Sequence, residues 1–217
     1  MNCSQFIANF LDLLFPRPNS VIQLELCSIQ TLLKNLPPAK QHPLPYIESA
    51  FEYRNPLTKK IVWEIKYRNN INLAKKVAIH MHDILLEQLS DDRLFTNAEP
   101  PLLVPIPMSD HRKKTRGFNQ ALLLARYIYQ TSPETYKKIV TPLIYKKNYI
   151  PQTTIKHKGK RMENTNNCFG IHNPKDIQKE NIILIDDVST TGATLKEARK
   201  ILLEHGARHV RAITIAH

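Results

Sequence analysis

Residues 182–206 contain an uninterrupted apolar run, IILI, that is followed at once by two adjacent acids, Asp186 and Asp187. A hydroxyl-rich loop around Gly192 comes next, and the following residues, ATLKEARKILLEHG, have apolar side chains at helical spacing up to a glycine. A short apolar run predicts a buried strand, and the periodic segment predicts an amphipathic helix that stops at its glycine. The segment therefore predicts a strand–loop–helix unit with a pair of carboxylates at the carboxyl end of the strand.

Short apolar runs and helical segments alternate over most of the remaining chain. Further predicted strands are LLVPIP at 102–107, IVTPLIY at 139–145 and HVRAITIA at 209–216. Further predicted helices are at 57–68, 72–89 and 118–130. Strands that alternate with helices indicate an α/β fold whose central sheet is mostly parallel and flanked by helices.

A proline-rich stretch, PPAKQHPLP at 37–45, is the one marked shift in composition along the chain. Such a stretch favours turns over a continuous helix or strand. We therefore expect a small N-terminal hood at 1–48, held over the site by apolar packing, and a main domain at 49–217.

The positive charge of the chain is concentrated in one segment. The formal net charge is +12, and residues 111–161 carry thirteen Lys and Arg residues against one acid, Glu134. A single basic run is usually a solvated face, but this asymmetry indicates an anionic partner, either phosphate on a small molecule or a nucleic-acid backbone. Basic residues beyond the needs of one small ligand are candidates for nucleic-acid contacts: Lys114, Lys146, Lys147, Lys156, Lys158, Lys160 and Arg161.

The cysteines and the hydropathy indicate the cellular compartment of the protein. Cys3, Cys27 and Cys168 are scattered and never spaced CxxC, which favours a reducing compartment and argues against a disulfide framework or a zinc ribbon. No apolar stretch approaches the roughly 20 residues needed to span a bilayer. The first residues lack the basic region and cleavage site of a secretory signal. We expect a cytoplasmic protein without membrane insertion.

The loop after Asp187 has the residue types that bind a phosphate group. Gly192 lets the backbone approach closely or take a positive φ angle, while threonine hydroxyls and the N–H groups at the start of the helix are donors for an anion. The carboxylates cannot bind phosphate, but they suit vicinal hydroxyls and a hydrated divalent cation, and a sugar phosphate presents both. A plain helix cap would need only one short polar residue. Neither GxxxxGK[ST] nor GxGxxG is present.

These residues carry a resemblance to a known family. The segment ILIDDVSTTGATL at 183–195 resembles the phosphoribosyl pyrophosphate (PRPP) motif of type I phosphoribosyltransferases. Two more segments, LLVPIPMSDHRKKTRGFNQALLLAR at 102–126 and PQTTIKHKGKRMENTNNCFGI at 151–171, are similar to parts of ComF-type competence proteins, where an RGFNQ box follows a VPxP turn. The resemblance covers residues 50–217 approximately and implies a type I phosphoribosyltransferase-like core.

The resemblance implies roles for two loops. In the first, Asp186 and Asp187 would hold the ribose 2′ and 3′ hydroxyls with Mg²⁺ nearby, and the turn would hold the 5′-phosphate. The implied PRPP-binding residues are Asp186, Asp187, Val188, Ser189, Thr190, Thr191, Gly192, Ala193 and Thr194. In the second, two prolines preset a tight turn at a strand end, which suits a pyrophosphate loop. Its implied residues are Pro105, Ile106, Pro107, Arg112, Lys113 and Arg116.

Two departures from the family bear on cofactors and catalysis. Many members carry an N-terminal zinc ribbon with paired CxxC motifs, which this chain lacks, so we expect no zinc; His42 with Cys27 is the other candidate pair. Purine-salvage phosphoribosyltransferases have an acid three residues after the second acid of the pair, where this chain has Thr190. Threonine is no general base at neutral pH, so no catalytic residue can be assigned.

Two main functions remain open. In the first, the protein binds PRPP and handles incoming single-stranded DNA during natural transformation, with competence proteins of the DNA-uptake pathway as partners, as the resemblance implies. In the second, it is an active PRPP-dependent phosphoribosyltransferase with an unidentified acceptor. The basic segment exceeds what one PRPP needs, which favours the first. A scaffold that has lost both ligands is a third alternative. Tyrosines among the basic residues are candidates for stacking on bases: Tyr127, Tyr129, Tyr145 and Tyr149.

Overall fold

The computed structural model describes residues 19–91, 99–145 and 168–217. Its centre is a four-stranded sheet of order β1-β6-β5-β2, in which every neighbouring pair of strands is parallel. The strands are β1 (Ile47–Phe51), β2 (Leu102–Pro105), β5 (Asn181–Val188) and β6 (His209–Ala216). The predicted α/β class with a mostly parallel central sheet is confirmed.

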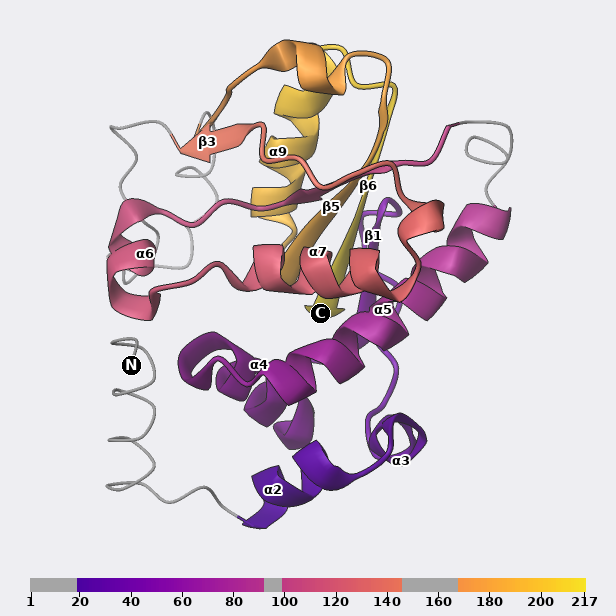
Figure 1. Ribbon diagram of the computed structural model, residues 1–217, viewed down its shortest axis with the longest axis vertical. Helices are drawn as coiled ribbons and strands as arrows, with labels where there is room; N and C mark the ends of the chain where they lie inside the picture. The colour runs from indigo at the N-terminus through magenta and orange to yellow at the C-terminus, as the bar shows by residue number, and fades with distance from the viewer. Residues whose placement is uncertain (1–18, 92–98, 146–167) are drawn as a thin grey trace.

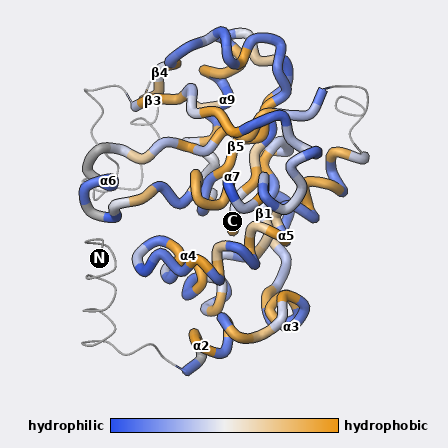
Figure 2. Tube along the Cα trace, viewed as in Figure 1, coloured by the Kyte–Doolittle hydropathy of each residue, from blue (hydrophilic) through white to orange (hydrophobic). Residues whose placement is uncertain are grey.

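Helices cover both faces of this sheet (Figure 1). Helices α5 (Ile71–Asp91) and α7 (Gln120–Thr131) pack on the face that carries Ile183 and Ile185, and α9 (Ala193–Glu204) packs on the opposite face. Because alternate residues of a strand point to opposite faces, a stretch of strand that is buried on both sides must be apolar, as residues 182–185 of β5 are. The tube in Figure 2 is accordingly hydrophobic along β5 and mainly hydrophilic along the short helix α6 (Asp110–Arg116).

The predicted strand at 139–145 forms only in part. Its first residues lie beside the central sheet, where Ile139 forms an isolated parallel bridge with Leu103 of β2. Its last residues make β3 (Leu143–Tyr145), which pairs antiparallel with β4 (Phe169–Ile171) in a separate two-stranded sheet. Pro142 precedes β3 and has no N–H to give to a ladder, which explains why the strand does not extend further back. Short 3₁₀ turns follow α7 and β4, as η1 (Pro133–Thr135) and η3 (Pro174–Ile177).

The N-terminal segment has two parts. Helices α2 (Asn19–Leu26) and α3 (Ile29–Lys34) pack against α5, where Lys76 donates to the carbonyls of residues 24, 25 and 27. The proline-rich stretch then runs antiparallel beside the outer edge of β1, with an isolated bridge between Pro38 and Phe51. The predicted boundary at residue 48 falls within β1. Among the described residues, none of the helices is both long and apolar enough to cross a membrane.

Candidate functional site

A cavity of about 250 Å³ opens beyond the carboxyl ends of β2 and β5. Parallel strands end at the same edge of a sheet, and this edge is where ligands of open α/β sheets bind. Both predicted loops contribute to the cavity. The predicted residues that line it are Ile106, Pro107, Arg112, Arg116, Asp186, Asp187, Val188, Thr190 and Thr194.

Other residues predicted for the site lie elsewhere. Pro105 is buried as the last residue of β2, and Lys113 and Lys114 are exposed on α6. Four residues of the hydroxyl-rich turn do not line this cavity in the described structure: Ser189, Thr191, Gly192 and Ala193. The remaining nucleic-acid candidates lie outside the described residues: Lys146, Lys147, Lys156, Lys158, Lys160 and Arg161.

The paired acids differ in their surroundings. Burial raises the pKa of the Asp186 carboxyl to about 7, and the neighbouring charge of Asp187 adds to the rise. The Asp187 carboxylate is paired with Lys66 of α4 (Pro56–Arg68), whose Nζ lies 2.9 Å from Oδ1. The Asp187 backbone N–H also donates to Asp186 Oδ1 at 2.8 Å. Near neutral pH, Asp186 is therefore only partly ionised, and Lys66 neutralises its neighbour. The sequence contains no local signal for this lysine.

The RGFNQ residues hold the loop after β2 in place. Asn119 is the N-cap of α7, with Oδ1 accepting from the N–H of Ala121 at 3.0 Å. Its Nδ2 donates to the carbonyl of Ile106, also at 3.0 Å. One side chain thus fixes both the start of a helix and the turn that lines the cavity. An Asn directly before a helical pattern is a recognised cap signal, but its second bond could not be read from the sequence.

Gln120 and Arg116 connect α6, α7 and α4. The buried Gln120 donates from Nε2 to the Lys66 carbonyl at 3.3 Å and accepts from Arg116 Nη1 at 3.3 Å. The guanidinium of Arg116 also lies over the Tyr67 ring, 5.1 Å from its centroid. Arg116 is thereby held at the cavity wall by contacts on two sides.

His42 of the N-terminal segment contacts the hydroxyl-rich turn. Its Nδ1 accepts the N–H of Leu44 at 3.0 Å, so the neutral ring carries its proton on Nε2, which donates to Ser189 Oγ at 3.0 Å. Burial lowers the pKa of His42, and the nearby His217 lowers it further. Gly192 has φ of 72°, and a Cβ there would lie 2.7 Å from Leu44 Cδ1. Gly192 therefore adopts the predicted positive φ angle, and its lack of a side chain also leaves room for the close approach of the N-terminal segment.

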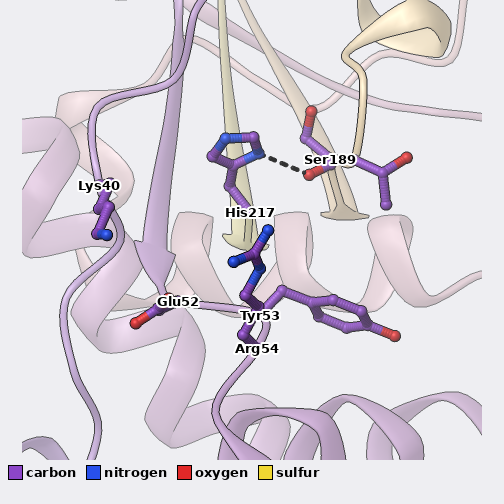
Figure 3. A pocket seen from close by; sticks show the side chains of 7 residues that line it. Lys40, Glu52, Tyr53, Arg54, Ser189 and His217 are labelled. Atoms are coloured by element: carbon purple, nitrogen blue, oxygen red, sulfur yellow. Dashed lines mark hydrogen bonds between the residues drawn. The ribbon is translucent and has the colours of Figure 1, made fainter.

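A second cavity, of about 380 Å³, lies beside the first at the ends of β1, β5 and β6 (Figure 3). In Figure 3, Lys40 and Glu52 lie on one side of this pocket and Tyr53 lies on the other. His217 follows β6, and its Nδ1 donates to the Ser189 carbonyl at 3.0 Å. The full lining is Lys40, Glu52, Tyr53, Arg54, Ser189, Thr190 and His217. Tyr53 and Thr190 line both cavities. No pattern in the sequence pointed to this pocket or to the two candidate general bases in its lining, Glu52 and His217.

The donor set at the first cavity fits Mg²⁺ better than a metal held by protein ligands alone. Within the described residues there is no cluster of three or more His, Cys, Asp or Glu side chains that could hold a metal. Mg²⁺ is usually bound by one or two carboxylates together with substrate phosphates and water, which suits Asp186 and Asp187. Of the cysteines, Cys27 is half-buried and Cys168 is buried. The expected absence of zinc stays a prediction, since Cys3 lies outside the described residues.

A parallel sheet with an acid pair and a hydroxyl-rich turn at its carboxyl edge defines a phosphoribosyl transferase domain, and residues 74–217 match the family described by that name. Competence protein ComFC of Bacillus subtilis (strain 168) is 32% identical over 176 residues, which cover 71% of this chain and 69% of that protein. DNA utilization protein YhgH of Escherichia coli (strain K12) is 26% identical over 194 residues, which cover 85% of this chain and 79% of that protein. The solved structure of the AQ2163 protein from Aquifex aeolicus is 18% identical, with a TM-score of 0.42 over 77% of this chain and 74% of that one. This chain therefore belongs to the ComF-type family of proteins with a phosphoribosyl transferase domain.

Proposed function

We propose that the protein binds PRPP together with Mg²⁺ in the first cavity and handles incoming single-stranded DNA in the cytoplasm during natural transformation. The observation that carries the proposal is that two separate loops, one with acids and hydroxyls and one followed by arginines, face a single cavity. A sugar carrying a phosphate at one end and a diphosphate at the other needs both.

Each part of PRPP has a chemically suitable neighbour in that cavity. Thr190, Thr194 and the N–H groups at the start of α9 suit the 5′-phosphate, because a helix N-terminus attracts anions. The carboxylates of Asp186 and Asp187 suit the ribose hydroxyls. The guanidinium groups of Arg112 and Arg116 suit the diphosphate, since arginine makes charge-assisted, bidentate contacts with phosphate oxygens. Bound Mg²⁺ would neutralise part of the diphosphate charge.

The role in DNA handling rests on two further observations. The relatives in Bacillus subtilis and Escherichia coli are named a competence protein and a DNA utilization protein. The net charge of +12 resides in residues 111–161, and the exposed Lys113 and Lys114 of α6 belong to that segment. Competence proteins of the same uptake pathway are the partners that this role implies.

Titration calorimetry with PRPP and Mg²⁺ tests the first half of the proposal. We expect the double variant Asp186→Asn with Asp187→Asn to weaken PRPP binding by tenfold or more, roughly the loss of one to two charge-assisted hydrogen bonds. Asp176→Asn is the matched control, because that acid is exposed on η3, and its affinity should equal that of the parent. An unchanged affinity in the double variant, with circular dichroism showing an intact fold, would contradict the assignment of the PRPP site.

Salt-dependent DNA binding tests the second half. Replacing Lys156, Lys158, Lys160 and Arg161 by glutamine should weaken binding of a single-stranded oligonucleotide and reduce the slope of log K against log salt by about 0.7 for each lost phosphate contact. Equal slopes for parent and variant would exclude these residues from the DNA surface.

A second candidate function is transfer of the phosphoribosyl group to an acceptor bound in the second cavity. The observation in its favour is that Glu52 and His217 line a pocket that adjoins Thr190. Either group could take a proton from an acceptor nitrogen as that nitrogen attacks the ribose C1′ and pyrophosphate departs. Pyrophosphate release measured over a panel of nucleobases tests it. Release that disappears in Glu52→Gln or His217→Gln, with PRPP binding retained, would favour transfer.

A further inference from the structure

Two large aromatic side chains are exposed on one face of α4. Trp63 is 46% exposed and Tyr67 is 52% exposed. They are separated by one helical turn, with ring centroids 5.7 Å apart and ring planes tilted by 41°. Neither residue belongs to the buried core, so packing does not account for their size. Lys59, one turn before Trp63, is exposed on the same face, because residues four apart lie above one another on a helix.

Positive charge surrounds these rings. The Arg68 guanidinium lies 5.5 Å from the centroid of the Trp63 ring, and the Arg116 guanidinium lies 5.1 Å from that of Tyr67. The one acid in α4, Glu64, is buried and faces Arg68 across 3.8 Å. The Arg68 side chain is itself only 6% exposed, so the cations that solvent reaches beside the two rings are the exposed Lys59 and the half-buried Arg116.

The face adjoins the first cavity. Arg116, which contacts the Tyr67 ring, also lines that cavity, as does Lys66, the residue before Tyr67. Helices α4 and α6 lie on the same side of the molecule in Figure 1. A chain-like ligand passing over Trp63 and Tyr67 would therefore reach the mouth of the cavity beside Arg116.

We propose that the face formed by Lys59, Trp63, Tyr67 and Arg116 binds single-stranded DNA, with successive bases stacked on Trp63 and Tyr67. The inference rests on the proposed DNA handling and assigns it a surface. Aromatic rings beside cations match the two parts of this polymer, bases and phosphates. A duplex does not fit, because its bases already stack on one another. An acidic protein would satisfy the cations but would have no use for two flat rings.

Trp63 is the only tryptophan of the chain, so tryptophan fluorescence reports on this face alone. The full chain is titrated with a short oligothymidylate carrying an anisotropy label, and Trp63 emission is followed in parallel with an unlabelled one. We expect quenching with the same midpoint as the anisotropy change. Base–aromatic stacking is worth about 1–3 kcal/mol per base, so Trp63→Ala and Tyr67→Ala should each weaken binding by about fivefold or more. Trp63→Phe should retain most of the affinity.

Two controls separate stacking from charge and from loss of structure. Leu86→Ala removes an apolar side chain of 39% exposure on α5 and should leave DNA affinity unchanged. Lys59→Gln should lower the salt slope, whereas Trp63→Ala should leave that slope as in the parent because an indole carries no charge. Polyglutamate, which has charge but no bases, should not quench Trp63.

The outcomes distinguish this inference from the function on which it rests. Anisotropy that shows DNA binding without quenching, and with full affinity in Trp63→Ala and Tyr67→Ala, would overturn the stacking face and leave DNA handling standing. The absence of any DNA binding would overturn both. DNA binding lost in both variants, with circular dichroism unchanged in both and PRPP binding unchanged in Trp63→Ala, would support the assignment.

Discussion

Lys66 of α4 and Asp187 of β5 form an ion pair in which Nζ and Oδ1 are 2.9 Å apart. Both side chains are mostly buried, with exposed fractions of 18% and 15%. Without a ligand, the lysine and Arg112 offset part of the negative charge of the adjacent acids. A ligand that brings Mg²⁺ or hydroxyl donors to Asp187 must compete with this lysine. The ion pair therefore connects the helix carrying Trp63 and Tyr67 to the acids at the end of the sheet.

We expect binding of PRPP with Mg²⁺ to release protons near neutral pH. The pKa of Asp186 is raised to about 7 by burial and by the charge of Asp187, so a large fraction of this carboxyl is protonated in the free protein. Coordination of Mg²⁺ or of a hydroxyl donor favours the ionised form, and binding should weaken as the pH falls below about 7. Calorimetry in buffers of different ionisation enthalpy measures the release. In Asp186→Asn the heat should depend on the buffer less than it does in the parent.

Lys66→Gln should destabilise the protein and raise the pKa of Asp186 further. The charge of Lys66 lowers that pKa, and without it Asp187 is left mostly buried and unpaired. We expect a loss of about 1–3 kcal/mol in urea unfolding, and proton release on PRPP binding that persists to higher pH. Lys200→Gln is the control, because Lys200 pairs with Glu204 across 3.9 Å on an exposed surface and should matter by less than about 0.5 kcal/mol. Equal stabilities for the two variants would contradict a structural role for the buried pair.

Gly192→Ala should cost more stability than Gly117→Ala. Both glycines have φ near 75°, at 72° and 75°, so a side chain adds a similar backbone strain of about 1–3 kcal/mol at each. A Cβ at 192 would also lie 2.7 Å from Leu44 Cδ1 and 3.0 Å from His42 Cε1, whereas a Cβ at 117 would have no atom within 4 Å among the described residues. The difference between the two unfolding free energies measures the contact with the N-terminal segment. A Leu44→Ala change made in the Gly192→Ala background should recover part of the lost free energy of unfolding. No recovery would count against the contact with the N-terminal segment.

His42 should make the protein less stable under mildly acidic conditions. Its pKa is lowered from 6.5 by burial and by His217, whose ring centroid is 4.2 Å away, so the folded state favours the neutral ring. The unfolded chain then binds more protons as the pH falls below 6.5, and the stability present above that pH is lost. Urea unfolding at neutral and at mildly acidic pH measures the free energy of unfolding that is lost between them. We expect this loss to be smaller in His42→Gln than in the parent. His172→Gln, at an exposed position, should behave as the parent does.

The parts of the fold with local signals were predictable. The strand and helix on either side of the acid pair follow from an apolar run and a 3.6-residue period, and both form, as β5 and α9. The cap at Asn119 has such a signal as well. Strand β1 was not predicted, because its sequence, IESAF, is short and its alternation is weak. Its place beside β6 depends on pairing between residues far apart in the chain.

The parts of the site that were missed all depend on long-range contacts. Lys66 reaches Asp187 from a helix in the first third of the chain, and no spacing rule connects the two. His42 was considered only as a weak metal candidate, and its actual partners, Leu44 and Ser189, use both ring nitrogens. The second cavity forms where the ends of three strands meet, so its residues have no common sequence pattern.

The shared wall between the two cavities has a thermodynamic consequence. Tyr53 and Thr190 line both, so a molecule that fixes these side chains from one side changes the shape and the mobility of the other side. If the proposed PRPP site is correct, we expect an occupant of the second cavity that moves these side chains to alter the affinity for PRPP. PRPP would then alter the affinity for that occupant by the same factor. In a chain of this size, binding in one of two pockets with a common wall can affect the affinity of the other without the movement of a domain.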